Sequence, residues 1–302
     1  MSPNEGFLGL KGSDVSHTSE QATAYIIPYG LEASVSYGAG TAHGPEAVIQ
    51  ASHQVELFDE QWWHEIYREY GIATLEYPDI PQDLNQAISH LKKITRDVVS
   101  AKKFPLFLGG EHTITAGIIA ELSMHHEAIT ILHFDAHADL RDGYDGVHYS
   151  HAAALRRCLD NTNVSLVSFG IRNISQEEVP FLEANLDRIK IYWAKDKSTW
   201  DYKAFEAYIR NKTVYLSFDV DGFDSSLMPA TGTPEPGGLF WDDVMQIIDK
   251  ASSISHFIGA DICELAPKDG LHACDFLVAK LAYKILSFSL AAKKKKRFLN
   301  CE

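Results

Sequence analysis

The amino-acid sequence predicts an α/β protein with a mostly parallel central sheet that is covered by helices on both faces. Short apolar runs rich in β-branched or aromatic residues alternate with longer stretches of helical spacing, which is the pattern of repeated βα units. The apolar runs are nearly continuous, as expected of strands that are buried on both faces. A chain of 302 residues with 45% apolar and 23% charged content can bury a core of this size.

The predicted strands are, in chain order, Ala24–Pro28, Pro105–Leu108, Ile129–Phe134, Ser165–Phe169, Lys190–Trp193, Val214–Phe218 and His256–Ala260. Helical spacing is clearest over Pro81–Lys103, where the apolar residues from Leu84 to Val98 fall on one face. The other predicted helices are Glu111–His126, His151–Leu159, Glu177–Asn185, Asp201–Arg210, Trp241–Lys250 and Cys274–Ala291. Because no repeat or linker divides the chain, we expect residues 21–302 to form one domain and the polar residues 1–20 to form a flexible N-terminal arm.

The formal net charge of −14 argues against a nucleic acid or an anionic membrane as partner, because basic side chains hold such partners. A small cationic ligand is compatible with this charge.

No apolar run reaches the ~20 residues that span a bilayer, and no secretory leader is evident, so we expect a cytoplasmic protein. We expect the basic run Lys293–Arg297 to be a solvated tail. Reduced thiols are expected, since no C-x-x-C spacing occurs among Cys158, Cys263, Cys274 and Cys301.

Acidic and histidine side chains follow four of the predicted strands at the point where each strand ends. The four segments are Gly109-Gly110-Glu111-His112, Asp135-Ala136-His137-Ala138-Asp139, Asp219-Val220-Asp221 and Asp261-Ile262-Cys263-Glu264. Ligands of open parallel sheets bind outside the carboxyl ends of the strands, so these segments converge if their strands are neighbours.

Spacing adds a second constraint on these side chains. Asp135, His137 and Asp139 recur at a period of two, as do Asp219 and Asp221, and side chains at this period point the same way from an extended segment. Without a cation, such a crowd of acceptors would be repulsive and costly to desolvate. We therefore expect a metal site.

The types of ligand suggest the metal and the reaction. Carboxylates and imidazoles with no nearby thiol suit hard divalent ions such as Mn²⁺. His112, after the tight turn of Gly109 and Gly110, is the natural sixth ligand, and six ligands suffice for two ions. Two ions ~3.5–4 Å apart lower the pKa of a shared water, which makes metal-assisted hydrolysis the expected reaction. Either aspartate motif alone could instead contain turn residues that cap the next helix, but both occur together at strand ends.

These motifs resemble the signatures of the ureohydrolase family, which comprises agmatinases, arginases, formimidoylglutamases and relatives. The resemblance covers most of the chain up to the last predicted helix, and it is closest to the agmatinases. It rests on Tyr37–Glu46, Gly109–His112, Asp135–Asp139, Ser217–Asp221 and Thr231–Gly238.

The resemblance implies a three-layer α/β/α sandwich, a catalytic domain with two Mn²⁺ ions per chain, and a homotrimer or homohexamer. Within the implied ligand set, Asp135 and Asp219 would bridge the two ions. Glu264 would pair with the substrate guanidinium, which suits a buried carboxylate that needs a cationic partner. The six implied ligands are His112, Asp135, His137, Asp139, Asp219 and Asp221.

A histidine that follows the Asp-x-His-x-Asp segment is implied to carry the proton to the leaving amine. His151 matches this place better than His148, which is expected to be a surface or helix-capping residue. Two positions depart from the family pattern. Glu111 stands where many relatives carry aspartate and is expected to affect only a neighbouring contact, and Asp224 lacks the proline that often follows it.

The loop Leu140–Gly146 is the segment expected to read the substrate's tail, and it resembles agmatinases. Asp142 could bind a distal amine, whereas Arg141 could bind a carboxylate. The two residues could also simply pair with each other at the surface. The implied reaction is hydrolysis of a guanidino compound to urea and an amine, with agmatine giving putrescine. The alternatives are guanidinobutyrate, arginine, formimidoylglutamate and guanidine.

Two readings from other classes remain. A zinc deacetylase of the same superfamily fold would use one metal, and the six predicted ligands disfavour it. A catalytically silent oligomeric relative is hard to reconcile with a complete set of ligands and His151.

Overall fold

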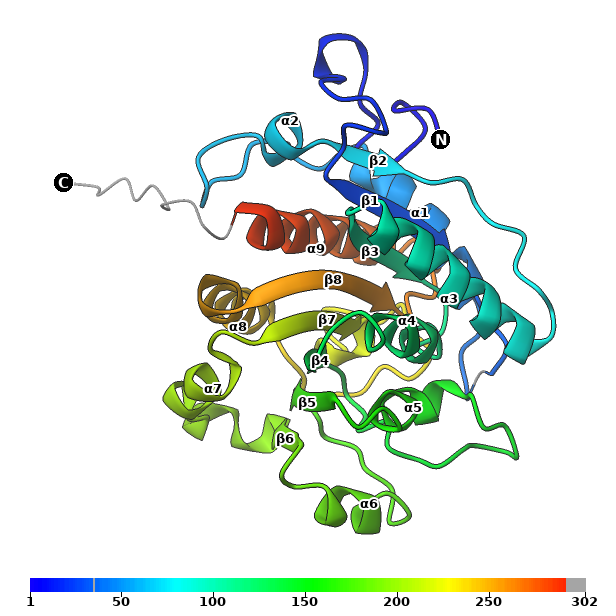
Figure 1. The fold of residues 1–302 in the computed structure, drawn as a ribbon, viewed down its shortest axis with the longest axis vertical. Coiled ribbons are helices and arrows are strands. Elements are labelled where there is room, and N and C mark those ends of the chain that lie inside the picture. The colour runs from blue at the N-terminus through cyan, green and yellow to red at the C-terminus, as the bar shows by residue number, and fades with distance from the viewer. Residues whose placement is uncertain (35, 292–302) are drawn as a thin grey trace.

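One sheet of eight parallel strands forms the centre of the protein, which we describe from a computed structural model covering residues 1–34 and 36–291. The strand order is β2-β1-β3-β8-β7-β4-β5-β6, and Figure 1 shows the strands stacked in this order from top to bottom. The strands are β1 Ala24–Tyr29, β2 Ile72–Thr74, β3 Phe104–Gly109, β4 Ile129–Phe134, β5 Val164–Phe169, β6 Ile189–Tyr192, β7 Thr213–Asp219 and β8 His256–Cys263. All seven predicted strands are present, and β2 is an additional strand.

The described residues also form nine α-helices, of which α1 and α2 are absent from the prediction. In α3, the Asp83 side chain accepts a hydrogen bond from the Gln86 N–H and so caps the helix where the predicted amphipathic pattern begins. The helices are α1 Gly44–Ser52, α2 Ile66–Tyr70, α3 Leu84–Ser100, α4 Ile114–Leu122, α5 Ala154–Leu159, α6 Val179–Ala184, α7 Tyr202–Ile209, α8 Trp241–Ile254 and α9 His272–Ala291.

Two apolar cores, one on each face of the sheet, give the protein three layers. Helices α1, α7, α8 and α9 contribute to one core, and α3, α4 and α5 contribute to the other. Neighbouring strand residues face opposite cores, as Ile131 and Leu132 of β4 do, because side chains alternate along a strand. This arrangement confirms the predicted three-layer α/β/α sandwich.

The first residues of the chain contact the body of the protein. Phe7, Leu8 and Leu10 are buried in the core that contains α9, and the N-terminal ammonium donates to the carbonyl of Thr74 in β2. This part of the predicted arm is therefore packed, while the division of the chain at residue 20 stays a prediction. The run Lys293–Arg297 lies outside the described residues.

None of the helices in residues 1–34 and 36–291 has the length and apolar content required to cross a membrane. The cysteines of this part of the chain are unpaired, and Cys158, Cys263 and Cys274 are buried. Burial raises the pKa of all three thiols.

Candidate metal centre and active site

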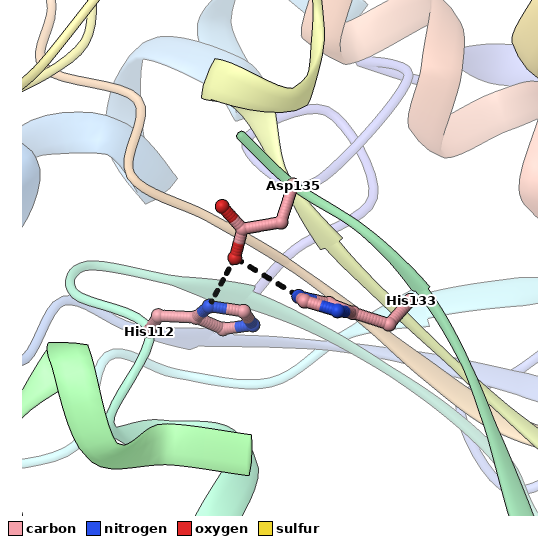
Figure 2. A group of neighbouring side chains, drawn as sticks. All are labelled: His112, His133 and Asp135. Atoms are coloured by element: carbon pink, nitrogen blue, oxygen red, sulfur yellow. Dashed lines mark hydrogen bonds and ion pairs between the residues drawn. The ribbon is translucent and has the colours of Figure 1, made fainter. Parts of the chain in front are cut away.

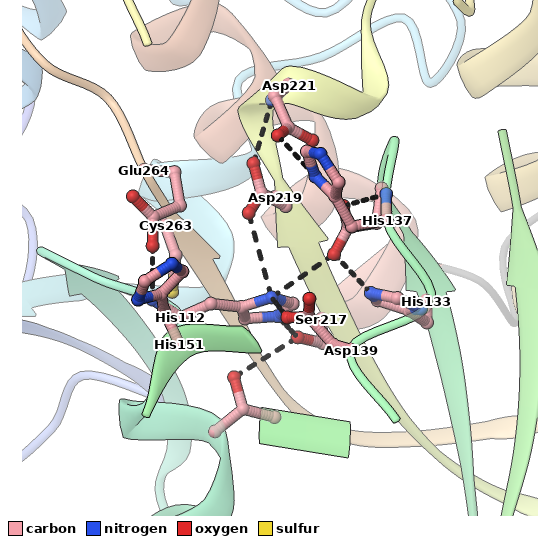
Figure 3. A network of polar contacts seen from close by, with 12 residues as sticks. His112, His133, His137, Asp139, His151, Ser217, Asp219, Asp221, Cys263 and Glu264 are labelled. Atoms are coloured by element: carbon pink, nitrogen blue, oxygen red, sulfur yellow. Dashed lines mark hydrogen bonds and ion pairs between the residues drawn. The ribbon is translucent and has the colours of Figure 1, made fainter. Parts of the chain in front are cut away.

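The carboxyl ends of four neighbouring strands bring the predicted site residues together. Strands β3, β8, β7 and β4 are adjacent in the middle of the sheet, and each of the four acidic or histidine segments lies at or directly after the carboxyl end of one of them. In a parallel sheet these ends lie at the same edge, so side chains that are far apart in the sequence become neighbours. Figure 3 shows them converging there.

His112 lies at the centre of a first group of carboxylates. Its Nδ1 is 3.0 Å from Asp139 Oδ2, 3.3 Å from Asp135 Oδ2 and 3.7 Å from Asp219 Oδ2. All four side chains are buried. Three carboxylate oxygens around one imidazole nitrogen form a set of ligands that suits a divalent cation.

His137 lies at the centre of a second group, which shares one residue with the first. Its Nδ1 is 3.0 Å from Asp221 Oδ2 and 3.5 Å from Asp135 Oδ1. Asp135 thus directs one carboxylate oxygen toward each histidine. A carboxylate divided in this way between two groups is placed to bridge two cations.

The electrostatics of the cluster show why a cation fits here. Burial, and then the neighbouring Asp135, raise the pKa of Asp139 to about 7. Burial and the nearby Asp221 raise the pKa of Asp219 well above its usual range. Burial alone would lower the pKa of His137, but Asp221 and Asp135 raise it to about 12. In the protein without metal, protons therefore occupy a site whose buried carboxylates need positive charge, and divalent ions can replace those protons.

Hydrogen bonds from neighbouring strands fix the orientation of His112. Its Nε2 lies 2.9 Å from Ser217 Oγ, and the Ser217 hydroxyl donates to Asp261 Oδ1 at 2.8 Å. Thr115 donates to the other oxygen of Asp261 at 2.9 Å. Because the Ser217 proton is committed to Asp261, His112 Nε2 is the donor to Ser217 Oγ, and Nδ1 is the nitrogen that faces the carboxylates. Burial alone would lower the pKa of His112, but Asp135 and Asp139 raise it well above its usual range, so Nδ1 carries a proton in the metal-free protein, and loss of that proton would free its lone pair for a cation.

His133 is a further buried histidine beside the cluster. Its Nε2 lies 2.9 Å from Asp135 Oδ2 and its Nδ1 lies 2.9 Å from Ser168 Oγ, while its ring stacks on that of His112 at 5.4 Å (Figure 2). Both ring nitrogens of His133 are engaged, so we assign it to orienting Asp135. The period of two extends back from Asp135 to His133, a signal that could have identified this residue from the sequence.

Two residues of the site have left-handed backbones that are uncommon outside glycine. Asp139 has a φ of 52° and Glu264 has a φ of 67°. Such conformations are rare and concentrate at functional sites. Glu264 Oε1 accepts a hydrogen bond from the His112 backbone N–H at 2.7 Å, which directs this half-buried carboxylate toward the cluster.

A cavity of about 320 Å³ opens over these residues. Five of the six predicted ligands line it, and Asp135 lies beneath them, fully buried. Glu264 and His151 also line the cavity. A buried carboxylate, Glu178, forms part of the wall, where it accepts hydrogen bonds from the backbone N–H groups of Leu140 and Ser175.

The structure separates the two residues that were predicted to bind the substrate's tail. Arg141 lines the cavity, where its guanidinium lies over the Tyr144 ring at 5.2 Å and 3.5 Å from exposed Glu177. Asp142 is exposed, lies outside the cavity lining and pairs with Arg157 at 2.6 Å. Neither residue pairs with the other, and the cavity does not bring Asp142 toward a ligand.

The two candidate histidines also differ in their surroundings. His148 contacts the Arg157 guanidinium and lies outside the cavity lining. His151 lines the cavity and contacts two serine hydroxyls, Ser34 Oγ at its Nδ1 and Ser36 Oγ at its Nε2. Burial lowers the pKa of His151, so its ring is neutral at neutral pH. No sequence pattern indicates the two serines, because 117 and 115 residues separate them from His151.

The loop Thr231–Gly238 forms part of the cavity wall through Thr231, Gly232 and Thr233. Asp224 anchors this loop. Its Oδ2 accepts hydrogen bonds from the N–H groups of Gly237 at 2.7 Å and Gly238 at 3.0 Å. A side-chain anchor thus holds the loop in the absence of the proline that often follows this aspartate.

The fold and the site together define an α/β protein with a carboxylate and histidine metal centre at the carboxyl edge of its sheet. A sequence profile of the Arginase family matches residues 22–287. The chain therefore belongs to the arginase family of ureohydrolases, enzymes that hydrolyse C–N bonds with a dinuclear metal centre. This confirms the predicted family and reaction class.

Relatives agree with this membership over almost the full chain. An N(1)-aminopropylagmatine ureohydrolase of Synechocystis sp. is 34% identical, and the match covers 98% of this chain and 99% of that protein. An agmatinase of Pyrococcus horikoshii is 31% identical, with 89% of this chain and 93% of that protein covered. The crystal structure of the agmatine ureohydrolase of Thermoplasma volcanium superposes with a TM-score of 0.81 at 28% identity, covering 92% of this chain and 93% of that one.

Proposed function

We propose that this protein hydrolyses a linear guanidino compound with a cationic tail to urea and an amine, using two Mn²⁺ ions. The observation that carries the proposal is the cluster of buried carboxylates around His112 and His137, with the half-buried carboxylate of Glu264 beside it. Burial raises the pKa of Glu264 well above its usual range, and a substrate guanidinium would supply the missing positive charge.

The chain's own side chains have distinct roles in this proposal. His112 and Asp139 would hold the first ion, and His137 and Asp221 the second. Asp135, which lies beside both histidines, and Asp219 would complete the ligand set. When bound, the ions lower the pKa of a water molecule and so supply the nucleophile at neutral pH. Glu264 orients the guanidinium, and His151 carries a proton to the leaving amine.

The cavity favours a substrate with a second positive charge. Six carboxylates line the cavity, and two of them, Glu111 and Glu178, are assigned neither to the ions nor to the guanidinium. The one arginine among the described lining residues, Arg141, already contacts Tyr144 and Glu177. Agmatine has an amine at the far end of its chain and is our first candidate substrate. N1-aminopropylagmatine, which extends that amine by a further aminopropyl group, is the second, because the Synechocystis relative that is 34% identical is named for it.

A urea-release assay tests the proposal. The purified protein, loaded with Mn²⁺, is given agmatine, N1-aminopropylagmatine, arginine, guanidinobutyrate or guanidine, and urea is measured over time. We expect the highest kcat/KM with one of the two cationic-tail compounds and none after chelation of the metal. Urea from arginine or guanidinobutyrate alone would overturn the assignment of the tail. Absence of urea from all five, with one zinc per chain and release of acetate from an acetylated polyamine, would instead support the deacetylase reading.

A further inference from the structure

The carboxylate of Glu111 connects the loop after β1 to the turn after β3. Its Oε2 accepts hydrogen bonds from the backbone N–H groups of Ala33 and Ser34, each at 2.6 Å, and its Oε1 lies 3.1 Å from Ser34 Oγ. Glu111 is buried, so these contacts are shielded from water. Burial raises the pKa of Glu111, and the three donors that converge on its carboxylate oppose this effect.

Ser34 continues this connection to His151. The Ser34 Oγ accepts a hydrogen bond from the His151 backbone N–H at 3.1 Å and lies 3.0 Å from His151 Nδ1. The other ring nitrogen, Nε2, lies 2.8 Å from the hydroxyl of Ser36, an exposed residue of the same loop. Both nitrogens of His151 are therefore held by the loop that Glu111 anchors.

Counting hydrogens decides which nitrogen of His151 carries the proton. The Ser34 hydroxyl has one hydrogen and two lone pairs. If it donates to the Glu111 carboxylate, its lone pairs accept from the His151 backbone N–H and from Nδ1–H. In the other tautomer, Ser34 would donate to Nδ1, and two oxygens 3.1 Å apart at Ser34 and Glu111 would repel with no hydrogen between them. In the first arrangement, with Nδ1 protonated, Nε2 carries the lone pair and accepts a hydrogen bond from the Ser36 hydroxyl.

We propose that Glu111 is a positioning residue that acts through Ser34 to hold His151 in the Nδ1–H tautomer, with Nε2 as the nitrogen that takes up and releases the proton. The inference rests on the proposed function for its effect on turnover. Its effect on the tautomer is independent of that function. Ser36, which is exposed, gives Nε2 a hydrogen-bonded path to solvent for exchanging the proton after each cycle.

The Glu111→Gln variant tests this role with little change of shape. Its amide oxygen can still accept the N–H groups of Ala33 and Ser34, but its NH₂ group now donates to Ser34 Oγ. The Ser34 hydroxyl must then turn to His151 Nδ1, which reverses the tautomer. Long-range ¹H–¹⁵N spectra of the histidine-labelled, metal-free chain at about pH 8 distinguish the two tautomers. The His151 signal is assigned by its loss in His151→Gln.

We expect the Nδ1–H tautomer in the wild-type protein and the Nε2–H tautomer in Glu111→Gln. In the Mn²⁺-loaded enzyme, Glu111→Gln should lower kcat about 10²-fold with little change in KM or metal content. Ser34→Ala should have a similar effect, and the double variant should be no worse than Ser34→Ala alone, because both changes break one connection. Glu121→Gln is the matched control. Glu121 is also a buried, hydrogen-bonded glutamate, but it pairs with Arg96 away from the cavity, so its replacement should leave kcat and the tautomer unchanged.

The same His151 tautomer in the wild-type protein and Glu111→Gln would overturn the inference, whatever the activity. Additive losses in the double variant would also overturn it, since they would mean that Glu111 acts separately from Ser34. If the wild-type enzyme releases no urea from any guanidino compound, the proposed function fails, and the spectra still decide the role of Glu111.

Discussion

The His112 backbone N–H donates to Glu264 Oε1 at 2.7 Å, so a residue proposed to hold a metal and a residue proposed to hold the substrate are joined by one hydrogen bond (Figure 3). The side chain of Glu264 extends from the end of β8, and that of His112 from the turn after β3, the strand that pairs with β8. Filling one site therefore constrains the other, because a shift of the His112 backbone would also move the carboxylate.

Glu264→Gln separates the charge of this carboxylate from its structural role. The amide oxygen can still accept the His112 N–H, but it cannot neutralise a guanidinium. A hydrogen bond to a charged group contributes about 1.5–3 kcal/mol, so kcat/KM should fall roughly 10- to 100-fold with the metal content unchanged. Steady-state kinetics with agmatine and metal analysis check this. An unaltered kcat/KM would remove Glu264 from the site.

His151→Ala should lower kcat by about 10²- to 10⁴-fold, the range typical of a lost general acid or base. Because His151 contacts Ser34 and Ser36 and not the clustered carboxylates, two ions should remain bound. Turnover assays and metal analysis by mass spectrometry measure the two quantities separately. Loss of metal in parallel with activity would show that His151 is a ligand. His148→Ala is the matched control and should keep most of the activity, because His148 contacts Arg157 outside the cavity.

Asp135→Asn should empty at least one metal site. Asp135 directs one oxygen toward His112 and the other toward His137. In the asparagine variant an NH₂ group replaces one of these oxygens, and this group has no lone pair with which to bind a metal ion. Equilibrium dialysis against Mn²⁺ gives the number of ions per chain. Two ions at full occupancy would count against a bridging role. The matched variant Asp142→Asn, at an exposed aspartate outside the cavity, should bind both ions.

Most of the fold could be predicted because buried strands and amphipathic helices leave strong periodic patterns. The elements that were missed are those with weak patterns. β2 has only three residues, α2 has five, and the nine-residue α1 begins with Gly44 and Pro45. β8 continues to Cys263 although its predicted strand stops at Ala260, because the carboxylate of Asp261 is satisfied inside the protein by Ser217 and Thr115. A sequence pattern reports polarity but not the partner that makes a buried charge tolerable.

The same difference between local patterns and distant contacts decides which site residues could be predicted. The six proposed metal ligands could be found because they recur at a period of two or directly follow strands, which are local features. Ser217 and Asp261, which orient His112, and Ser34 and Glu111, which orient His151, depend on contacts between distant segments. Asp142 was predicted to bind the substrate's tail because it lies close to the metal motif in the sequence. Its carboxylate is instead exposed and pairs with Arg157.

Asp224→Ala should loosen the wall of the cavity. This half-buried carboxylate accepts hydrogen bonds from Ser226, Gly237 and Gly238, which lower its pKa to about 2. Removing it should destabilise the fold by about 1 kcal/mol and raise KM more than it lowers kcat, because Thr231–Thr233 line the cavity but carry no proposed chemistry. Denaturant unfolding and kinetics measure both effects. Exposed Asp79 gives a matched control, Asp79→Ala, and equal KM values in the two variants would refute the anchoring role.

The stability of the metal-free protein should fall as the pH rises from about 6 to about 8. The pKa values of Asp139, Asp219, His112 and His137 are all raised in the folded state, Asp139 to about 7 and His137 to about 12. The folded state then holds more protons than the unfolded state, so the free energy of unfolding decreases with pH. For Asp139, the contribution is complete below its unfolded pKa near 4 and is lost as the pH rises through about 7. Asp135 has a lowered pKa, and its opposite contribution falls below this window.

Bound Mn²⁺ should reverse this dependence, because it replaces the protons that the carboxylates and histidines release. Each excess proton in the folded state corresponds to about 1.4 kcal/mol per pH unit, which thermal unfolding can resolve. The increase in Tm on adding Mn²⁺ to chelator-treated protein should therefore be larger at about pH 8 than at about pH 6. Asp139→Asn, which cannot titrate, should show a smaller loss of metal-free stability over the same range. A metal-free Tm that stays constant or rises between these pH values would mean that the cluster is not protonated as its burial requires.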